Sequence, residues 1–367
     1  MRKLSVFVVI CMCFGLIACS TGTPSAAAEE AAEPSTEAQA ADQASETTSE
    51  KEHIKIGLSL PTQEYVAWVA GKDSFEKAAA KYNEEHTDSE IELVITVADN
   101  DATKQATQIA DMINDGADVI IASSVDATAI LTSITATLAE GVPFINYGRE
   151  VIPTSDDQKP TATFVSDGQM SSYVSTAFMF QRMIADGIAP EDIKFVHVFG
   201  SLTDGNSALY KAGVEQAEKE YGVEEVALVE SEWNVDTLLA RLSPVMQSHP
   251  EVNAIFFPAT VVAAPVQTVL ERLGRWVPYP EEGHVYLASR DADYVGCTLI
   301  QDGYLDGVGT EDLIGLANMT LEGAIKAVHG EEIEEVYVPC PLVSLDNFDE
   351  MRDRGLLWGL DYADLAN

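Results

Sequence analysis

Short apolar runs alternate with amphipathic stretches from His53 onward, and this alternation restricts the fold more than any other feature of the chain. Within each stretch, apolar residues such as Ala106, Ile109 and Ile113 recur three and four positions apart, which is the period of one helix face. Apolar strands between such helices indicate a parallel sheet covered on both faces. The first series predicts strands at 54–60, 91–97, 119–121 and 142–145, and helices at 71–85, 106–113 and 130–138.

The same alternation then begins again, which predicts a second lobe of the same kind. The chain from His53 to Asn367 is long enough for two lobes of ordinary size rather than one core. The predicted fold is therefore α/β, with two doubly wound parallel-sheet lobes. The second series predicts strands at 164–165, 195–199, 226–229, 254–257 and 285–288, and helices at 169–185, 207–221, 237–247 and 262–273.

The first residues have the pattern of an export signal. Arg2 and Lys3 precede an apolar run of signal-peptide length, and this run ends in LIAC, which resembles a bacterial lipobox. We therefore expect residues 1–19 to be a lipoprotein signal peptide with the lipid on Cys19, although a plain signal peptide ending in cysteine is the alternative. Residues 20–52 contain no aromatic or large aliphatic side chain, so we expect a disordered linker there.

The composition excludes some classes of partner. The formal net charge of -39 would repel phosphates, so nucleic acid is not an expected partner. Of the five cysteines, Cys11 and Cys13 belong to the expected signal peptide. We expect Cys297 and Cys340 to be two buried thiols rather than a disulfide, because nothing in their spacing suggests a disulfide framework.

Motifs of enzymes on sheets of this kind are absent from the sequence. There is no GxGxxG after the first predicted strand, no GxxxxGK[ST] and no GxSxG, and the six histidines are not set at ligand spacing. We therefore expect no catalytic residues, no metal site and no cofactor. A catalyst stays the less favoured alternative, since doubly wound sheets also host many enzymes.

The segments that follow the predicted strands are the candidates for a binding site. In parallel α/β sheets, ligands bind beyond the carboxyl ends of the strands, where loops from different units converge. These segments are rich in aromatic, amide and charged residues. They lie at 61–68, 98–101, 123–126, 146–149, 200–206, 233–236, 258–260 and 289–293.

Several segments, taken in their order and spacing, resemble the type I periplasmic binding proteins for sugars, especially the ribose, xylose and multi-sugar group. The resemblance covers nearly all of the chain from His53 to Asn367. The segments are IGLSLPTQEYVAW at 56–68, DND at 99–101, QIADMINDGADVIIASSVDAT at 108–128, GVPFINYGRE at 141–150, FGSLTDGNSALYKAG at 199–213 and ASRDAD at 288–293.

The resemblance implies two discontinuous lobes, because the chain crosses three times between the lobes in this family. Matching segment by segment places the crossings near Val165, Gly309 and Val338. The first lobe would contain 53–164 and 310–337, and the second would contain 165–309 and 338–367.

The resemblance also implies which residues contact the ligand. Trp68 and Trp233 would lie against opposite faces of a sugar ring, Arg149 would donate to its hydroxyls, and Asp291 would be the main carboxylate. The expected set from these segments is Gln63, Tyr65, Trp68, Ser123, Arg149, Asp204, Asn206, Trp233, Asp291 and Glu311.

Three positions depart from the family pattern. Gly148 stands where an aspartate is usual, and Glu311 stands where a glutamine or lysine is common. The segment 258–260 (PAT) replaces an Asn and Asp pair and resembles the autoinducer-2 receptors of the same superfamily. These departures affect the expected ligand and leave the expected fold unchanged.

The function implied by the resemblance is that of a solute-binding lipoprotein of an ABC importer. It would be a monomer, anchored to the extracytoplasmic face of the cell membrane, and it would close around a small polar ligand, expected to be a sugar, and pass it to a permease. The alternatives are a receptor for autoinducer-2 or another non-sugar ligand, and a receptor that reports to chemotaxis or a sensor kinase. Export and the lack of a basic helix-turn-helix exclude a DNA-binding regulator.

Overall fold

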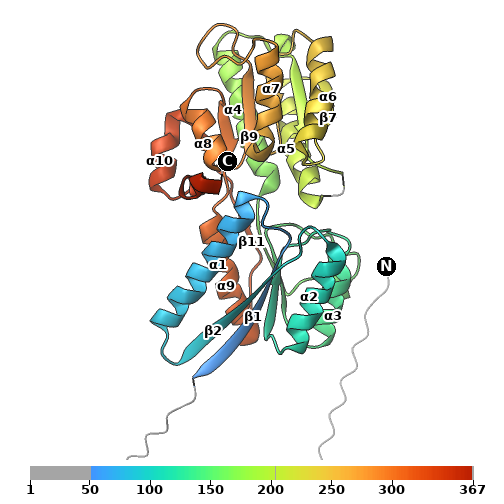
Figure 1. Ribbon diagram of the computed structural model, residues 1–367, viewed down its shortest axis with the longest axis vertical. Helices are drawn as coiled ribbons and strands as arrows, with labels where there is room; N and C mark the ends of the chain where they lie inside the picture. The colour runs from blue at the N-terminus through green and yellow to red at the C-terminus, as the bar shows by residue number, and fades with distance from the viewer. Residues whose placement is uncertain (1–50, 203, 366–367) are drawn as a thin grey trace, which may run out of the picture. The chain divides into compact units, whose positions relative to one another are not determined.

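In the computed structural model, which describes residues 51–202 and 204–365, the strands form two six-stranded sheets, one in each lobe (Figure 1). The described residues belong to a single compact unit. The expected signal peptide at 1–19, its Cys19 and nearly all of the expected linker at 20–52 lie outside the described residues. The first strand begins at Glu52, one residue inside the segment that the sequence assigns to the linker.

The first sheet has the strand order β11-β5-β4-β3-β1-β2, and every pairing in it is parallel. Its strands are β1 (Glu52–Leu60), β2 (Ser89–Val97), β3 (Val119–Ala122), β4 (Phe144–Tyr147), β5 (Ala162–Ser166) and β11 (Val336–Val338). Its helices are α1 (Val66–Glu85), α2 (Ala102–Asn114), α3 (Ile130–Ala139) and α9 (Leu313–Val328).

Alternate residues of the strands in the first lobe face different helices. Val119 and Ile121 of β3 pack in a cluster with α1 and α9, whereas Ile120 packs in a cluster with α2 and α3. Figure 1 shows the same arrangement, with α1 and α9 on one side of the sheet and α2 and α3 on the other. Both faces are therefore covered, which is why these strands are apolar at consecutive positions.

The second sheet has the order β12-β10-β9-β8-β6-β7 and is parallel except at β12, which runs antiparallel to β10. Its strands are β6 (Phe195–Phe199), β7 (Glu225–Glu230), β8 (Ala254–Phe256), β9 (Tyr286–Arg290), β10 (Gly307–Gly309) and β12 (Leu342–Ser344). Its helices are α4 (Gly168–Ala185), α5 (Gly205–Tyr221), α6 (Val235–Ser248), α7 (Ala263–Arg272), α8 (Tyr294–Gln301) and α10 (Phe348–Asp353). The 3₁₀ helices are η1 (Asp156–Gln158), η2 (Pro190–Asp192), η3 (Thr260–Val262), η4 (Leu345–Asn347) and η5 (Trp358–Leu365).

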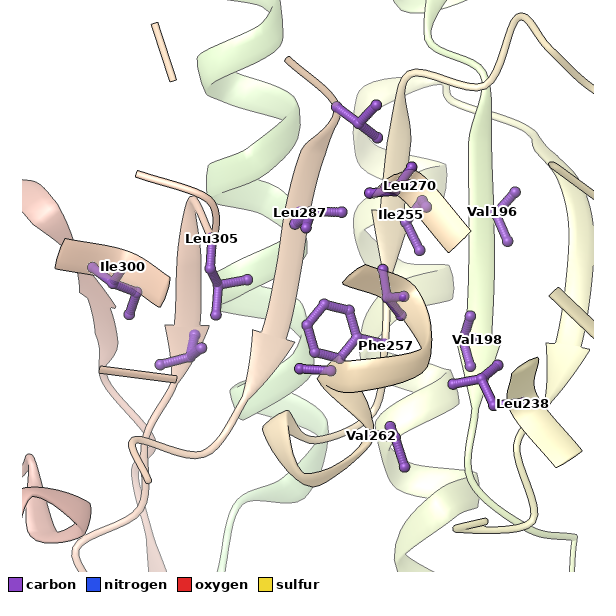
Figure 2. Packing of buried hydrophobic residues seen from close by; sticks show 14 of the residues in the cluster. Val196, Val198, Leu238, Ile255, Phe257, Val262, Leu270, Leu287, Ile300 and Leu305 are labelled. Atoms are coloured by element: carbon purple, nitrogen blue, oxygen red, sulfur yellow. The ribbon is translucent and has the colours of Figure 1, made fainter. Parts of the chain in front are cut away.

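The largest core cluster fills one face of the second sheet. Figure 2 shows Val196 and Val198 of β6 and Ile255 of β8 beside Leu238 of α6 and Leu270 of α7. The opposite face is covered by α4 and α5, whose apolar residues pack on the alternate strand positions. The second lobe is therefore covered on both faces, as the first lobe is.

The chain passes between the sheets three times, after β5, after β10 and after β11. The C-terminal segment does not stay within the second lobe. Trp358 of η5 packs against Ala70 and Leu313 of the first lobe, while the Gly359 N–H donates to the Ala292 carbonyl of the second. The segment 338–367, which the resemblance assigns to the second lobe, therefore contacts both lobes through η5.

Helix α1 begins at Val66, five residues before the predicted start at Gly71. Gly71 suggests a helix boundary in the sequence, but it lies inside the helix, where a Cβ would come within 2.9 Å of the Tyr147 hydroxyl. The glycine therefore serves close packing. The earlier start places Trp68 in the first turn of α1.

Cys297 and Cys340 are both buried free thiols, as expected from their spacing. None of the helices in residues 51–202 and 204–365 combines the length and the apolar content that crossing a membrane requires.

Replacing Leu238 with Ala should destabilise the second lobe, because the Leu238 side chain is fully buried in its largest cluster. We expect the free energy of unfolding to fall by about 2–5 kcal/mol. Urea denaturation followed by circular dichroism measures this change. The control is Leu228→Ala on β7, where the leucine is 42% exposed and the loss should stay below about 1 kcal/mol. Equal losses in the two variants would contradict the packing described.

Candidate ligand-binding site

A cavity of about 810 Å³ lies where the loops that follow the strands of both sheets converge. Its lining from the first lobe includes residues 64–68 after β1 and 147–149 at the end of β4. Its lining from the second lobe includes Trp233 after β7, and Arg290, Asp291 and Asp293 at and after the end of β9. The volume lies within the range of sites for small molecules, and its position is the one expected of parallel sheets.

The wall from the first lobe is built around Trp68. The indole meets the Tyr147 ring edge-on, with 6.4 Å between ring centroids, and the Arg149 guanidinium carbon lies 5.2 Å from the centroid of the Trp68 ring. Arg149 Nη1 also donates a 2.8 Å hydrogen bond to the Ser124 carbonyl. The guanidinium is thus fixed by two contacts beside an aromatic wall.

Gly148 lies behind Trp68 and explains one departure from the family pattern. Its φ is +71°, a conformation that L side chains rarely adopt, and a Cβ on it would lie 3.3 Å from the Trp68 ring. An aspartate at this position would therefore be strained and would displace the indole. The absence of a carboxylate at position 148 and the position of the Trp68 indole therefore follow from the same packing.

The wall from the second lobe is built around Trp233. Its indole Nε1 donates a 3.0 Å hydrogen bond to Asp204 Oδ2, and Asp204 also caps α5 by accepting from the Asn206 N–H. The Trp233 ring meets the Tyr210 ring edge-on at 6.5 Å. The indole therefore has a fixed orientation at the cavity.

Left-handed backbone is concentrated at this cavity. Of the five non-glycine residues with positive φ in the described part of the chain, all but Asp99 line the cavity, and they are Asn100, Glu232, Trp233 and Asp291. Such a conformation costs on the order of 1–3 kcal/mol per residue and persists only where the surroundings fix it. This concentration of strain marks the cavity as a functional site.

A buried charge cluster centred on Arg290 lines the cavity. Arg290 is 2% exposed, its guanidinium carbon lies 3.6 Å from the centroid of the Tyr210 ring, and its Nη2 pairs with a Glu311 carboxylate oxygen. The same nitrogen lies 3.7 Å from Asp291 Oδ1. One guanidinium thus serves two carboxylates. Burial raises the pKa of Asp291, although Arg290 acts in the opposite direction.

The two lobes touch beside this cavity. Asn206 at the start of α5 accepts a hydrogen bond of 3.4 Å from the Glu150 N–H of the first lobe through its Oδ1. Burial, together with Asp167 and Glu335, raises the pKa of the Glu150 carboxyl. The contact couples the position of α5 to the segment after β4.

The structure brings eight of the ten residues expected from the sequence to the cavity. They are Tyr65, Trp68, Arg149, Asp204, Asn206, Trp233, Asp291 and Glu311. Gln63 is not among the lining residues, because its side-chain amide donates to the carbonyls of Thr62 and Trp68 and braces the loop. Ser123 is fully buried and does not line the cavity either.

Other lining residues were missed by the sequence argument. Arg290 directly precedes the expected Asp291, and Tyr210 lies four residues after Asn206 on the same helix, so both had a signal in their spacing. Glu232 and Asp126 belong to loops at the correct ends of strands. Trp358 had no signal, because only the tertiary structure brings η5 to the cavity.

Comparison with protein families matches residues 56–332 to the periplasmic binding protein domain. Among curated proteins, the chain is 20% identical to the ribose import binding protein RbsB of Bacillus subtilis, over 80% of this chain and 88% of that protein. It is 22% identical to the D-xylose-binding periplasmic protein of Escherichia coli, over 77% of this chain and 80% of that protein.

Solved structures of the same fold include two ABC transporter solute-binding proteins. The protein from Bacillus halodurans, with bound myo-inositol, gives a TM-score of 0.71 at 22% identity over 84% of this chain and 100% of that chain. The protein from Actinobacillus succinogenes, with bound D-allose, gives a TM-score of 0.70 at 18% identity over 81% of this chain and 99% of that chain. At these identities the likeness is one of fold.

Replacing Asp291 with Asn should change how stability depends on pH. Because the pKa of Asp291 is raised in the folded state, the folded protein binds this proton more tightly than the unfolded chain does. Its contribution to stability is therefore lost as the pH rises from the ordinary value of 3.8 towards neutrality. In Asp291→Asn this part of the decrease should disappear.

Thermal unfolding midpoints measured from about pH 4 to about pH 7 test this expectation. This interval runs from the ordinary pKa of an aspartate to neutral pH. Asp302→Asn, at an exposed carboxylate after α8, is the control and should keep the pH dependence of the unmodified protein. An identical pH dependence in Asp291→Asn and the unmodified protein would overturn the assignment.

Proposed function

The chain belongs to the type I periplasmic binding proteins, and from this membership we propose that it captures a small polyhydroxylated solute between its two lobes without transforming it. The observation that carries the proposal is the cavity between two aromatic walls, one from each lobe, with charged groups between them. The relatives are binding proteins, which supports capture rather than catalysis.

The aromatic walls suit a ring with hydroxyl groups on its rim. A pyranose or cyclitol has C–H groups that pack on an indole, while its hydroxyls point sideways to polar partners. Trp68 and Trp233 supply the walls, and Arg149, Asn206 and Asp291 supply donors and acceptors. Ribose, D-xylose, myo-inositol and D-allose in the names of similar proteins support this ligand class.

The charge of the lining disfavours an anionic ligand. Among the described residues that line the cavity, Arg149 and Arg290 are the only cationic side chains, and Arg290 already pairs with Glu311. Several of the carboxylates cap helices or accept from the lining itself. The lining carboxylates are Glu64, Asp126, Asp204, Glu232, Asp291, Asp293 and Glu311. We therefore propose a neutral or cationic ring rather than a sugar acid or sugar phosphate.

Capture works by a shift between open and closed arrangements of the lobes. We take 53–164 with 310–337 as one lobe and 165–309 with 338–367 as the other, with η5 in contact with both. A ligand bound to groups of both lobes favours the closed arrangement by the free energy of contacts that the open one lacks.

The cellular setting follows from the export pattern of the first residues. We propose that residues 1–19 are removed as a signal peptide up to a lipidated Cys19, and that residues 20–52 tether a monomeric body to the outer face of the membrane. The captured solute would then pass to an ABC permease. Incorporation of labelled palmitate into the unmodified chain and not into Cys19→Ala tests the anchor.

Loss of a charged anchor should weaken ligand binding. We expect Arg149→Gln and Asp291→Asn each to reduce affinity by about 2–4 kcal/mol, because each leaves buried ligand groups without a partner. The ligand is first found by a thermal-shift screen over pentoses, hexoses, cyclitols and their amino derivatives, and isothermal titration then gives the affinities. Arg272→Gln, on the exposed surface of α7, is the control.

Unchanged affinity in both anchor variants would refute the site. Ligand recovered from the protein should show an unaltered NMR spectrum, whereas conversion to a product would favour a catalyst.

Ligand charge provides an independent test of the lining. For the ring that binds best, the corresponding acid should bind at least about tenfold more weakly, since a carboxylate would meet an excess of like charge. Competition titrations of matched pairs, such as a hexose and its uronic acid, measure the difference. Tighter binding of the acid would show that the guanidinium groups, not the carboxylates, decide selectivity.

A further inference from the structure

We propose that His197, Glu218 and Glu225 form a binding site for one divalent cation of the zinc type, on the face of the second sheet that α4 and α5 cover. The three residues come from β6, from α5 and from β7, and each offers one ligand atom. These atoms lie within 4.8 Å of one another. His197 Nδ1 is 3.4 Å from Glu225 Oε2.

His197 is the observation that points to a ligand. Its side chain is 0% exposed, and it lies between the aromatic rings of Phe195 and Phe256. Neither ring nitrogen has a hydrogen-bond partner among the described residues, whereas most buried polar atoms have one. An unprotonated imidazole nitrogen in this position can offer its lone pair to a metal.

Glu218 supplies a second unsatisfied atom. Its Oε1 is buried and has no hydrogen-bond partner among the described residues. Lys211 is the nearby cation, and its ammonium already pairs with Glu215. Two carboxylates beside a buried imidazole therefore lack a paired cation, and a metal ion would supply one while satisfying the buried atoms of His197 and Glu218.

The ligand set selects the metal. One imidazole nitrogen and two carboxylate oxygens suit Zn²⁺, whereas Ca²⁺ and Mg²⁺ prefer oxygen ligands alone. Zinc ligands at about 2.0–2.2 Å from the metal lie roughly 3.3 Å from one another, so the present spacing requires only a small contraction. Glu225, whose side chain is 35% exposed, gives access from solvent and leaves room for a water as the fourth ligand.

A cation bound at this site would stabilise the second lobe and would not change the ligand-binding cavity. Glu225 begins β7 and Glu218 lies near the end of α5, whereas the cavity lies beyond the opposite ends of the strands. A bound cation would tie α5, β6 and β7 together. We therefore expect a more stable second lobe, and an unchanged affinity for the ligand of the cavity.

The test uses the full chain after removal of metals with EDTA. Titration with ZnCl₂ should show a saturable site with one equivalent per chain and a rise in the thermal unfolding midpoint. MgCl₂ and CaCl₂ at the same concentration should raise the midpoint less, because they attach only weakly to an acidic chain. Co²⁺ at this site should give visible d–d absorption. Glu218→Gln and Glu225→Gln should each lower Zn²⁺ affinity at least about tenfold and remove the Co²⁺ band.

Glu224→Gln is the matched control, since Glu224 is an exposed carboxylate directly before Glu225 and is not among the three ligands. Only binding that is lost in the two ligand variants and kept in the control counts, because an acidic chain also attracts cations weakly elsewhere. Absence of stoichiometric binding, or equal binding in all variants, would overturn the proposal. The zinc titration does not involve the ligand of the cavity, so a negative result would not contradict the proposed function.

Discussion

The structure depends on one geometric constraint, which is that the carboxyl ends of the parallel strands of both sheets face a shared cavity. Each strand of a parallel sheet needs a crossover helix to return the chain, so every loop at the carboxyl end belongs to a different unit. Trp68 after β1 and Trp233 after β7 are thereby brought to one cavity from distant parts of the sequence. The indole walls and the anchors between them are consequences of this arrangement.

Strain and charge at the cavity have the same origin. Trp233 and Asp291 occupy left-handed backbone in the segments that follow β7 and β9, where the chain turns to present a side chain to the cavity. Asp291 then lies beside Arg290, which also holds Glu311 after β10. The resulting excess of carboxylates is the reason why we propose a neutral or cationic ligand rather than a sugar acid.

The two proposed sites use the second sheet in different ways. The cavity uses loops beyond the carboxyl ends of the strands, which can move when the lobes close. The His197 cluster uses the middle of β6 and the starting residue of β7, which are fixed by strand pairing. A metal at the second place can therefore stabilise the lobe without altering the first, which is why the two experiments are separable.

Hydrophobic periodicity alone predicted two α/β lobes, because the apolar strands and the amphipathic helices such as 207–221 are local patterns. Resemblance to a known family supplied eight of the lining residues, and Arg290 and Tyr210 were within reach of local spacing. Three features were decided only by the tertiary structure. Trp358 reaches the cavity from the C-terminal end, Gly71 lies inside a helix for close packing, and His197 meets Glu218 and Glu225. In each case the contact joins residues from different elements, and no local period in the sequence encodes which elements become neighbours.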